Sequence, residues 1–398
     1  MNILIIEPES KGHYIILYIK YLVKILLKLN HNIVFLTTRR STNHISFKSV
    51  FKNVKNINYE FIDDLKPKNN KDLHLLLYQI KYFKLIKTKF KELNIKYNFN
   101  FIFLNSFDHF DKSLSLFGSP FQNVDFGGIF VNIKFHFGEY NLGRYGRYTH
   151  ISKFLFRKLL AIKNLKFILS NDIFFLKFVK TKNFLNYKKI KYLNEFREFS
   201  DHFKKKYARK KLGLPNKSKL VLIYGALKKS KGIEKIVEIL KDKNLDQNIK
   251  VVMAGEQDRD IKKFLSKKNC KKLISDKKIF ILKGFQDEYN ESLIFSAVDI
   301  VWIGYDKSFP FVSGVLYQAV AMGIPIITCD HGLIGFTNKS FKLGPAVDIN
   351  NDNEIICSLN NLCKKQVVSY YLKRSKHFKK KISPKLFVNQ IKTLLSYY

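Results

Sequence analysis

Short apolar runs alternate with longer amphipathic segments along most of the chain. The short runs are rich in β-branched and aromatic residues, which is typical of buried strands, whereas the longer segments follow the period of a helix. This alternation predicts βαβ units and parallel sheets. In the first half the expected strands are Asn2–Ile6, Asn32–Thr37, Phe101–Leu104, Gly128–Ile133 and Phe167–Leu169. The expected helices there cover His13–Leu29, Leu73–Glu92, Ile151–Ile162 and Asp172–Val179.

The alternation lapses in a charged stretch between Asn194 and Ser218 and then starts again. Pro and Gly at the end of this stretch, followed by a fresh strand, predict a domain boundary. The second half then has expected strands at Leu220–Tyr224, Lys250–Ala254, Ile279–Leu282, Ile300–Ile303 and Pro325–Thr328. We therefore expect two doubly wound α/β domains, at 1–195 and 219–365, joined by a linker at 196–218. The tail at 366–398 is expected to be helical, with a break near Pro384, and to pack back toward the first domain.

Charge is the unusual feature of the composition. The 398 residues include 72 Lys+Arg against 32 Asp+Glu, a formal net charge of +40. Such a charge attracts nucleic acid, anionic membranes or phosphorylated ligands. A nucleotide bias of the genome is the competing explanation, because Lys, Asn, Ile, Phe and Tyr are all abundant. We expect no nucleic-acid partner, since the sequence has no RNA- or DNA-binding signature.

Other features point to a protein of the cytoplasm. The four cysteines show no metal-ligand spacing and are expected to be reduced. No signal peptide is apparent at the N-terminus. The apolar stretch Tyr14–Leu29 carries Lys20, Lys24 and Lys28 on one stripe, which is typical of an amphipathic helix and not of a membrane span.

A basic loop with two glycines follows the first strand of the second half. Gly225 ends the strand, three lysines that include Lys229 and Lys231 follow, and Gly232 comes just before the next helix. Glycines let a ligand approach the backbone, and a helix N-terminus with lysines suits a diphosphate. The alternative is a loop whose lysines are simply solvated.

A second segment, about 80 residues further on, offers another helix N-terminus. Ser313 and Gly314 stand where the helix should begin, Gln318 follows about one turn later, and Gly323 and Pro325 end the helix. Free N–H groups at such a terminus suit phosphate or sugar oxygens. The alternative is an ordinary Ser N-cap and Gly C-cap.

Together the two segments resemble the donor domain of GT-B glycosyltransferases, in particular the retaining glycosyltransferase family four. That family's Gly-Arg-Leu-x-x-x-Lys-Gly pattern matches Gly225 through Gly232, and its Glu-x7-Glu segment matches Pro310 through Gln318. The segment Phe280–Phe285 is similar to the family's base-binding strand and loop, and Ser296–Trp302 to the helix–strand pair that follows. In the first half, Gly12 after strand one and the His31 segment also fit the family.

The resemblance implies the GT-B fold, two Rossmann-like domains facing across a cleft, and a nucleotide-diphosphate sugar as donor. Lys231 would then neutralise the diphosphate, with Lys229 beside it and Gly12 and Gly225 lining the donor site. The backbone of Gly284 and Phe285 would meet the base, and Gln318 would reach the ribose. The N–H groups of Ser313, Gly314 and Val315 would hold phosphate or sugar oxygens. Enzymes of this kind generally work without a metal ion, so no cofactor is expected.

Three positions depart from the family pattern. Ala226 stands in place of the Arg, Pro310 in place of the first Glu and Gln318 in place of the second. Lys228, Lys229 or an Arg from the other domain are candidates to replace the lost positive charge. Gln318 can still hydrogen-bond a ribose, although more weakly than a carboxylate.

Candidate catalytic residues in the first half are Asp108 and His109, which follow an expected strand and would act as base or polariser toward the acceptor hydroxyl. The alternative is a capped loop with an exposed His. Arg144 and Arg147 are either phosphate ligands or solvated. Asp258 and Asp260 imitate a metal-binding Asp-x-Asp pair, but they open an expected helix, where Asp is a good cap.

The expected function is glycosyl transfer from a UDP- or GDP-sugar to a glycan or lipid-linked acceptor, in cell-surface polysaccharide or glycolipid synthesis. An anionic membrane surface is a further expected partner, reached from the cytoplasmic side. Two alternatives stay open: a catalytically inactive sugar-nucleotide-binding protein, suggested by the missing acidic pair, and a nucleic-acid-binding protein, suggested by the charge alone.

Overall fold

The computed structural model describes residues 1–8, 18–51, 54–65, 72–142, 148–198 and 202–396. The chain divides into two compact units. The first comprises Met1–Tyr140, Arg144–Asn194 and Lys385–Tyr398, and the second comprises Asn141–Gly143 and Glu195–Pro384. Each unit has its own sheet and its own hydrophobic core.

The first unit is built on a seven-stranded parallel sheet with the order β3-β2-β1-β4-β5-β6-β7. Its strands are β1 (Asn2–Ile6), β2 (Asn32–Thr38), β3 (Ile57–Ile62), β4 (Phe101–Leu104), β5 (Asp125–Ile129), β6 (Leu165–Ser170) and β7 (Ile190–Tyr192). Its helices are α1 (Lys20–Lys28), α2 (Arg39–Asn43), α3 (Ile45–Phe51), α4 (Asp72–Tyr97), α5 (Asp111–Phe117), α6 (Thr149–Ala161), α7 (Ile173–Thr181) and α17 (Pro384–Leu395).

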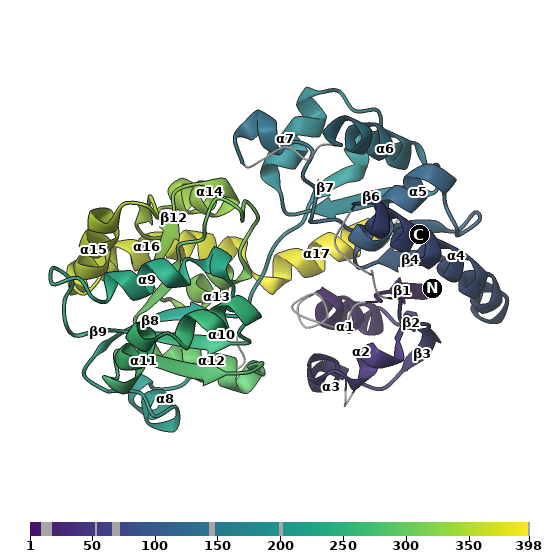
Figure 1. Ribbon diagram of the computed structural model, residues 1–398. Helices are drawn as coiled ribbons and strands as arrows, with labels where there is room; N and C mark the ends of the chain where they lie inside the picture. The colour runs from purple at the N-terminus through teal and green to yellow at the C-terminus, as the bar shows by residue number, and fades with distance from the viewer. Residues whose placement is uncertain (9–17, 52–53, 66–71, 143–147, 199–201, 397–398) are drawn as a thin grey trace. The chain divides into compact units, whose positions relative to one another are not determined.

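Helices cover both faces of this sheet, which explains why its central strands are apolar throughout. Helices α4 to α7 pack on one face (Figure 1), where their side chains form a core rich in phenylalanine. On α17, at the end of the chain, Phe387 is fully buried and its ring lies 6.1 Å from that of Tyr18.

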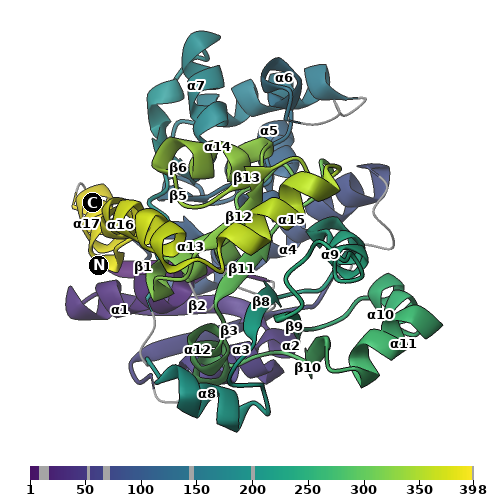
Figure 2. The same cartoon turned by 90° about the vertical axis from the view of Figure 1, so that its left-hand side faces the viewer.

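The second unit is a six-stranded parallel sheet with the order β10-β9-β8-β11-β12-β13. Figure 2 shows the strands in this succession, from β13 at the top to β10 at the bottom. Its strands are β8 (Lys219–Tyr224), β9 (Ile249–Gly255), β10 (Ile279–Lys283), β11 (Ile300–Ile303), β12 (Ile326–Cys329) and β13 (Ala346–Val347). Its helices are α8 (Lys205–Lys211), α9 (Ile233–Ile239), α10 (Arg259–Leu265), α11 (Lys268–Ser275), α12 (Glu288–Ala297), α13 (Gly314–Met322), α14 (Gly332–Phe341), α15 (Asp352–Asn361) and α16 (Lys365–Lys381).

Alternate residues of β8 enter two separate cores. Leu220, Leu222 and Tyr224 pack with α8, α12 and α13, whereas Val221 and Ile223 pack with α9, α10 and α15. This alternation confirms a doubly wound sheet. Both sheets also contain a switch point, where the chain changes from winding one way to winding the other. It lies between β1 and β4 in the first unit and between β8 and β11 in the second.

Several boundaries differ from the sequence-based expectations. The strand expected at Gly128–Ile133 is Asp125–Ile129, because Gly127 and Gly128 lie inside it. A methyl group on Gly128 would stand 1.8 Å from the Leu104 carbonyl oxygen, so these glycines permit close strand packing and do not end the strand. The outer strands β3, β7 and β13 were not expected.

The expected linker at 196–218 contains helix α8. Arg209 on this helix is buried and donates from Nη2 to Asp299 Oδ2 at 2.6 Å, and Lys205 Nζ donates to the other carboxylate oxygen at 2.8 Å. Burial would raise the pKa of Asp299, but its hydrogen bonds from Lys205 and the Leu220 N–H and the nearby positive charges hold that pKa below its usual value. These contacts fasten α8 to the second unit.

Candidate functional site

The loop after β8 lies at the switch point of the second sheet, where ligands of such folds bind. Gly225 ends β8 with φ +89°, and Gly255 ends β9 with φ +136°. A methyl group on Gly255 would stand 2.0 Å from the Gly225 carbonyl oxygen. Glycine at both positions therefore lets the ends of the two strands lie close together, with no side chain at either end.

Lys231 is held in a fixed position behind this loop. Its Nζ donates to the Tyr224 carbonyl oxygen and lies 5.4 Å from the centre of the Tyr305 ring. Its own carbonyl oxygen accepts from Trp302 Nε1 at 3.1 Å. Gly232 follows with φ +65°, and a methyl group there would stand 2.2 Å from the Gly304 carbonyl oxygen. Lys231 is thus fixed against the end of β11, with its charge at the carboxyl edge of the sheet.

The N-terminus of α13 meets the same edge. Ser313 precedes the helix, but its hydroxyl does not cap it. The Ser313 Oγ instead donates to the Tyr305 hydroxyl at 3.2 Å. Since Lys231 and Ser313 both contact the Tyr305 side chain, the two segments singled out in the sequence come together. The Gly C-cap is confirmed, because Gly323 ends α13 in a left-handed conformation.

The N–H groups of Gly314 and Val315 have no acceptor within their own helix, whereas the Leu316 N–H donates to the Ser313 carbonyl oxygen at 3.1 Å. The side chains of Ser313 and Val315 are buried, so these two residues present backbone groups only. The positive end of this nine-residue helix and the Lys231 ammonium therefore both lie against the Tyr305 side chain. This combination is suited to an anion.

The side-chain amide of Gln318 has a partner on a neighbouring helix. Its Nε2 donates to Glu291 Oε1, from the neighbouring helix α12. Tyr224 lies beside the same Glu291 carboxylate. Burial raises the pKa of the Tyr224 hydroxyl well above its usual value, and Glu291 raises that pKa further. Glu291 therefore brings a carboxylate next to Gln318, the residue that stands where the resembled family has its second Glu. Sequence reasoning missed Glu291, which has no distinctive spacing.

The remaining donor-site candidates of the second unit lie at the carboxyl edge of the same sheet. Gly284 has φ +85° in the turn after β10, and its carbonyl oxygen accepts from Gln286 Nε2 at 3.0 Å. Phe285 follows in that turn. Lys229 is exposed in the short 3₁₀ turn Lys229–Lys231. Gly12 lies outside the described residues, as do Arg144 and Arg147.

Asp108 in the first unit lies after β4, at the carboxyl edge of its sheet. Its Oδ1 accepts from the Asn132 N–H at 3.1 Å, and its Oδ2 accepts from Ser106 Oγ at 3.2 Å. Burial raises the pKa of Asp108 to about 7, and the nearby Asp111 carboxylate adds to the rise against those two hydrogen bonds. Asp108 can therefore exchange a proton near neutral pH.

His109 faces an aromatic group. Its ring centre lies 6.2 Å from that of Tyr78 and 6.4 Å from that of Tyr82. The structure thus places His109 against α4 and only partly exposed, in contrast with the alternative of a fully exposed loop histidine.

A buried carboxylate occupies the switch point of the first sheet. Glu7 follows β1 and is 1% exposed, and its Oε2 accepts from Asn105 Nδ2 at 2.7 Å. The Asn105 Oδ1 is buried without a partner among the described residues. Sequence reasoning did not single out Glu7, because a lone acidic residue after a strand carries no periodic signal.

Asp258 is a helix cap, as expected. Its Oδ1 accepts from the Ile261 N–H at 2.9 Å at the start of α10. Across the described part of the chain, no three His, Cys, Asp or Glu side chains are grouped closely enough to hold a metal ion.

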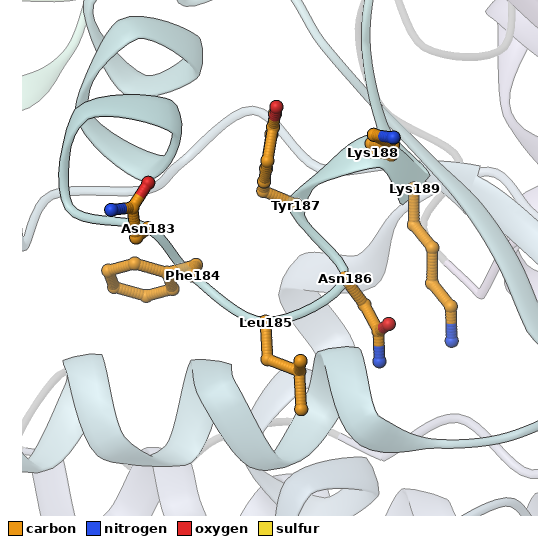
Figure 3. Close-up of a pocket in the computed structure, with 7 residues that line it drawn as sticks. All are labelled: Asn183, Phe184, Leu185, Asn186, Tyr187, Lys188 and Lys189. Atoms are coloured by element: carbon orange, nitrogen blue, oxygen red, sulfur yellow. The ribbon is translucent and has the colours of Figure 1, made fainter.

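A pocket of about 370 Å³ lies in the turn after α7 (Figure 3), and none of the predicted site residues lines it. Seven consecutive residues, Asn183–Lys189, line it. Lys189 Nζ donates to the carbonyl oxygens of Leu160 and Ile162 at 3.0 and 2.8 Å, at the end of α6. Lysine commonly stabilises helix ends in this way, so the turn has a structural explanation.

The two units together define the fold class: the chain has the GT-B fold, with two parallel-sheet Rossmann-like domains. It resembles the sucrose-phosphate synthase of Thermosynechococcus elongatus at 15% identity, covering 100% of this chain and 98% of that one, with a TM-score of 0.72. Anabaena HepE in complex with UDP and glucose matches at 13% identity over 100% of both chains, with a TM-score of 0.68. WaaG, a glycosyltransferase involved in lipopolysaccharide biosynthesis, matches at 13% identity over 98% of this chain and 99% of that one, with a TM-score of 0.63.

The family comparison concerns the second unit. Residues 204–385 match the model of the glycosyl transferases group 1, which includes every donor-site segment described above except Gly12. No curated protein sequence matches the chain.

Proposed function

We propose that this protein transfers a sugar from a nucleotide-diphosphate sugar to an acceptor hydroxyl. One observation carries the proposal: Lys231 and the N-terminus of α13 meet at Tyr305, at the switch point of the second sheet. The match of residues 204–385 to the glycosyl transferases group 1 supports it. The complex of HepE with UDP and glucose supports a UDP-sugar, and a GDP-sugar is the alternative donor.

The chemistry follows from these positions. The bond between the anomeric carbon and the diphosphate oxygen breaks, and its electron pair leaves with the diphosphate. Lys231 and the α13 N–H groups stabilise that developing negative charge, so no metal ion is required. The acceptor oxygen bonds to the anomeric carbon and loses its proton. We assign Asp108 as the group that takes the proton, with His109 as a polarising neighbour, because a base with a pKa near 7 suits this step.

The other assignments concern recognition of the nucleotide. The turn at Gly284 and Phe285 contacts the base, and Gln318 with Glu291 contacts the ribose. The hydrogen bond between Gln318 and Glu291 supports this, because it places a carboxylate beside the amide. Following the resemblance to family four, we expect the sugar to be transferred with retention of its anomeric configuration.

The first experiment combines binding with turnover. UDP- and GDP-sugars are screened by thermal shift, and release of nucleoside diphosphate is then measured with extracted glycan and glycolipid acceptors. A ligand at about 100 times its Kd adds about 2.7 kcal/mol of stability. Lys231→Met should weaken donor binding and turnover, whereas Lys243→Met, on an exposed lysine outside this loop, is the matched control.

Two outcomes would contradict the proposal. Tight binding of a sugar nucleotide without turnover would favour an inactive binding protein, which Ala226, Pro310 and Gln318 make the second candidate. Absence of binding by every sugar nucleotide would refute both functions.

We further propose a lipid-linked or glycan acceptor at an anionic membrane on the cytoplasmic side, in polysaccharide or glycolipid synthesis. Helix α6 supports this: Ile151 and Phe154 are 55% and 56% exposed, and Lys158 lies over the Phe154 ring at 5.0 Å. The stretch 148–170 contains no Asp or Glu. Basic residues near such a surface contribute about 1 kcal/mol each.

Vesicle co-sedimentation tests the membrane proposal. Wild type should sediment with anionic but not neutral vesicles, and the double variant Ile151→Ser/Phe154→Ser should sediment less. Equal sedimentation with both vesicle types would contradict it. No helix among the described residues meets the length and apolarity that a bilayer crossing requires.

A further inference from the structure

Arg197 stands at the N-terminus of α13, although the two are more than a hundred residues apart in sequence. A methyl group on Gly314 would lie only 2.8 Å from the Arg197 Nη2 atom. The backbone N–H of Arg197 donates to the Ile382 carbonyl oxygen at 3.1 Å, which ties this segment to the end of α16. The guanidinium therefore occupies the space that the missing Gly314 side chain leaves open.

Arg197 forms no ion pair in this place with any residue that the structure describes. The N-terminus of a helix carries a partial positive charge, so a guanidinium beside it is repelled unless an anion lies between them. The Arg197 Nε is buried and has no hydrogen-bond partner in the described part of the chain. Among the described residues, no carboxylate lies within 4.0 Å of the guanidinium. The positive groups gathered here outnumber the one carboxylate nearby, Glu291, whose Oε1 accepts from Gln318, and such a cluster suits an anionic ligand.

Position 226 lacks the charged side chain that the resembled family has there. The family pattern has an Arg at this position, beside Lys231, and Ala226 is exposed here with no charge to offer. Arg197 lies beside Gly314, whose predecessor Ser313 shares Tyr305 with Lys231. A guanidinium also binds two phosphate oxygens at once, which an ammonium group cannot do.

We propose that Arg197 is the second cation of the diphosphate site and replaces the arginine that position 226 has lost. The assignment rests on the proposed function, because it identifies a ligand of the same donor diphosphate. Arg197 binds the phosphate nearest the N-terminus of α13, and Lys231 binds from the side of β8.

A structural role is the competing explanation. Arg197 lies near enough to Tyr224 for its charge to act on that hydroxyl, which is grouped with Glu291. If Arg197 only supports this group, its loss should weaken binding of every nucleotide alike. If it binds phosphate, its loss should act on the diphosphate specifically.

The experiment compares full-length variants by titration calorimetry with UDP, GDP, UMP and GMP. Arg197→Ala should bind the preferred nucleoside diphosphate about ten- to a hundredfold more weakly, with a smaller loss for the monophosphate. Arg197→Lys should keep part of the affinity. The matched control is Arg374→Ala, on an exposed arginine of α16.

The double variant Arg197→Ala/Ala226→Arg is the decisive one. It rebuilds the family's arginine at an exposed position and should restore most of the diphosphate affinity, which a misfolded protein could not do. The proposal is overturned if Arg197→Ala binds the diphosphate as wild type does, or if all four nucleotides weaken equally and Ala226→Arg restores nothing. If wild type binds neither UDP nor GDP, the proposed function fails with it.

Discussion

Asp108 allows a test of the first unit that does not require the substrate. Its pKa of about 7 is raised mainly by burial, so the folded protein favours the neutral carboxyl. The stability that a raised carboxyl pKa contributes is fully present below the unfolded pKa of about 3.9. It is lost as pH rises toward the folded pKa. Asp108→Asn keeps the shape of the neutral carboxyl and does not titrate. Wild type should therefore lose stability relative to Asp108→Asn as pH rises from 5 to 7.

The size of the effect follows from the two pKa values. Between pH 5 and pH 7 an unfolded Asp is almost fully ionised, whereas Asp108 in the folded protein is ionised only at the upper end. The difference corresponds to about 2 kcal/mol, at about 1.4 kcal/mol for each pKa unit. Urea unfolding at the two pH values measures it. Far-UV circular dichroism follows both units, and fluorescence of Trp302, the single tryptophan, reports the second unit separately.

Asp63→Asn, which changes an exposed carboxyl in the same unit, is the control and should follow wild type. The reasoning would be refuted if Asp108→Asn and wild type differed by the same amount at both pH values. Turnover supplies the functional half of the test: it should rise with pH around 7 and fall about a hundredfold or more in Asp108→Asn, if Asp108 is the base.

Three further predictions concern the second unit. Gly232→Ala should destabilise it by about 1–3 kcal/mol, measured by Trp302 fluorescence in urea, because φ is +65° there and the methyl group meets the Gly304 carbonyl oxygen. Asp299→Asn should cost about 2 kcal/mol at pH 7, since Arg209 loses a charged partner, and the cost should shrink below about pH 4 as the depressed pKa of Asp299 is approached. Gly314→Ala should leave the melting temperature unchanged but weaken nucleoside diphosphate binding about tenfold in calorimetry, because it displaces the Arg197 guanidinium.

The central strands of both sheets could be predicted because they are buried on both faces. A continuous apolar run as short as Ile300–Ile303 is typical of a strand that is buried on both faces, and the strand β11 has those bounds. The outer strands β3, β7 and β13 gave no such signal. In β3 the sequence Ile57–Ile62 includes Asn58 and Glu60, because most of its residues are only partly buried.

The donor site was predictable where a residue's role depends on local backbone geometry. Gly225, Gly232 and Gly323 all have positive φ, which glycine adopts most easily, and each was expected at a boundary of a strand or helix. Ser313 shows the limit of this reasoning. Its spacing fits an N-cap, yet its hydroxyl bonds to Tyr305, a residue eight positions away whose orientation depends on packing.

By itself the sequence determined the two doubly wound sheets, the order of most of their elements and the glycine positions, because hydrophobic period and backbone conformation are local properties. Only the tertiary structure decided which charges meet. Arg197 and Glu291 stand beside α13 through contacts that join segments far apart in the chain, and neither has a spacing that would reveal it. Electrostatic interactions depend on distance through space, so no pattern along the chain encodes them.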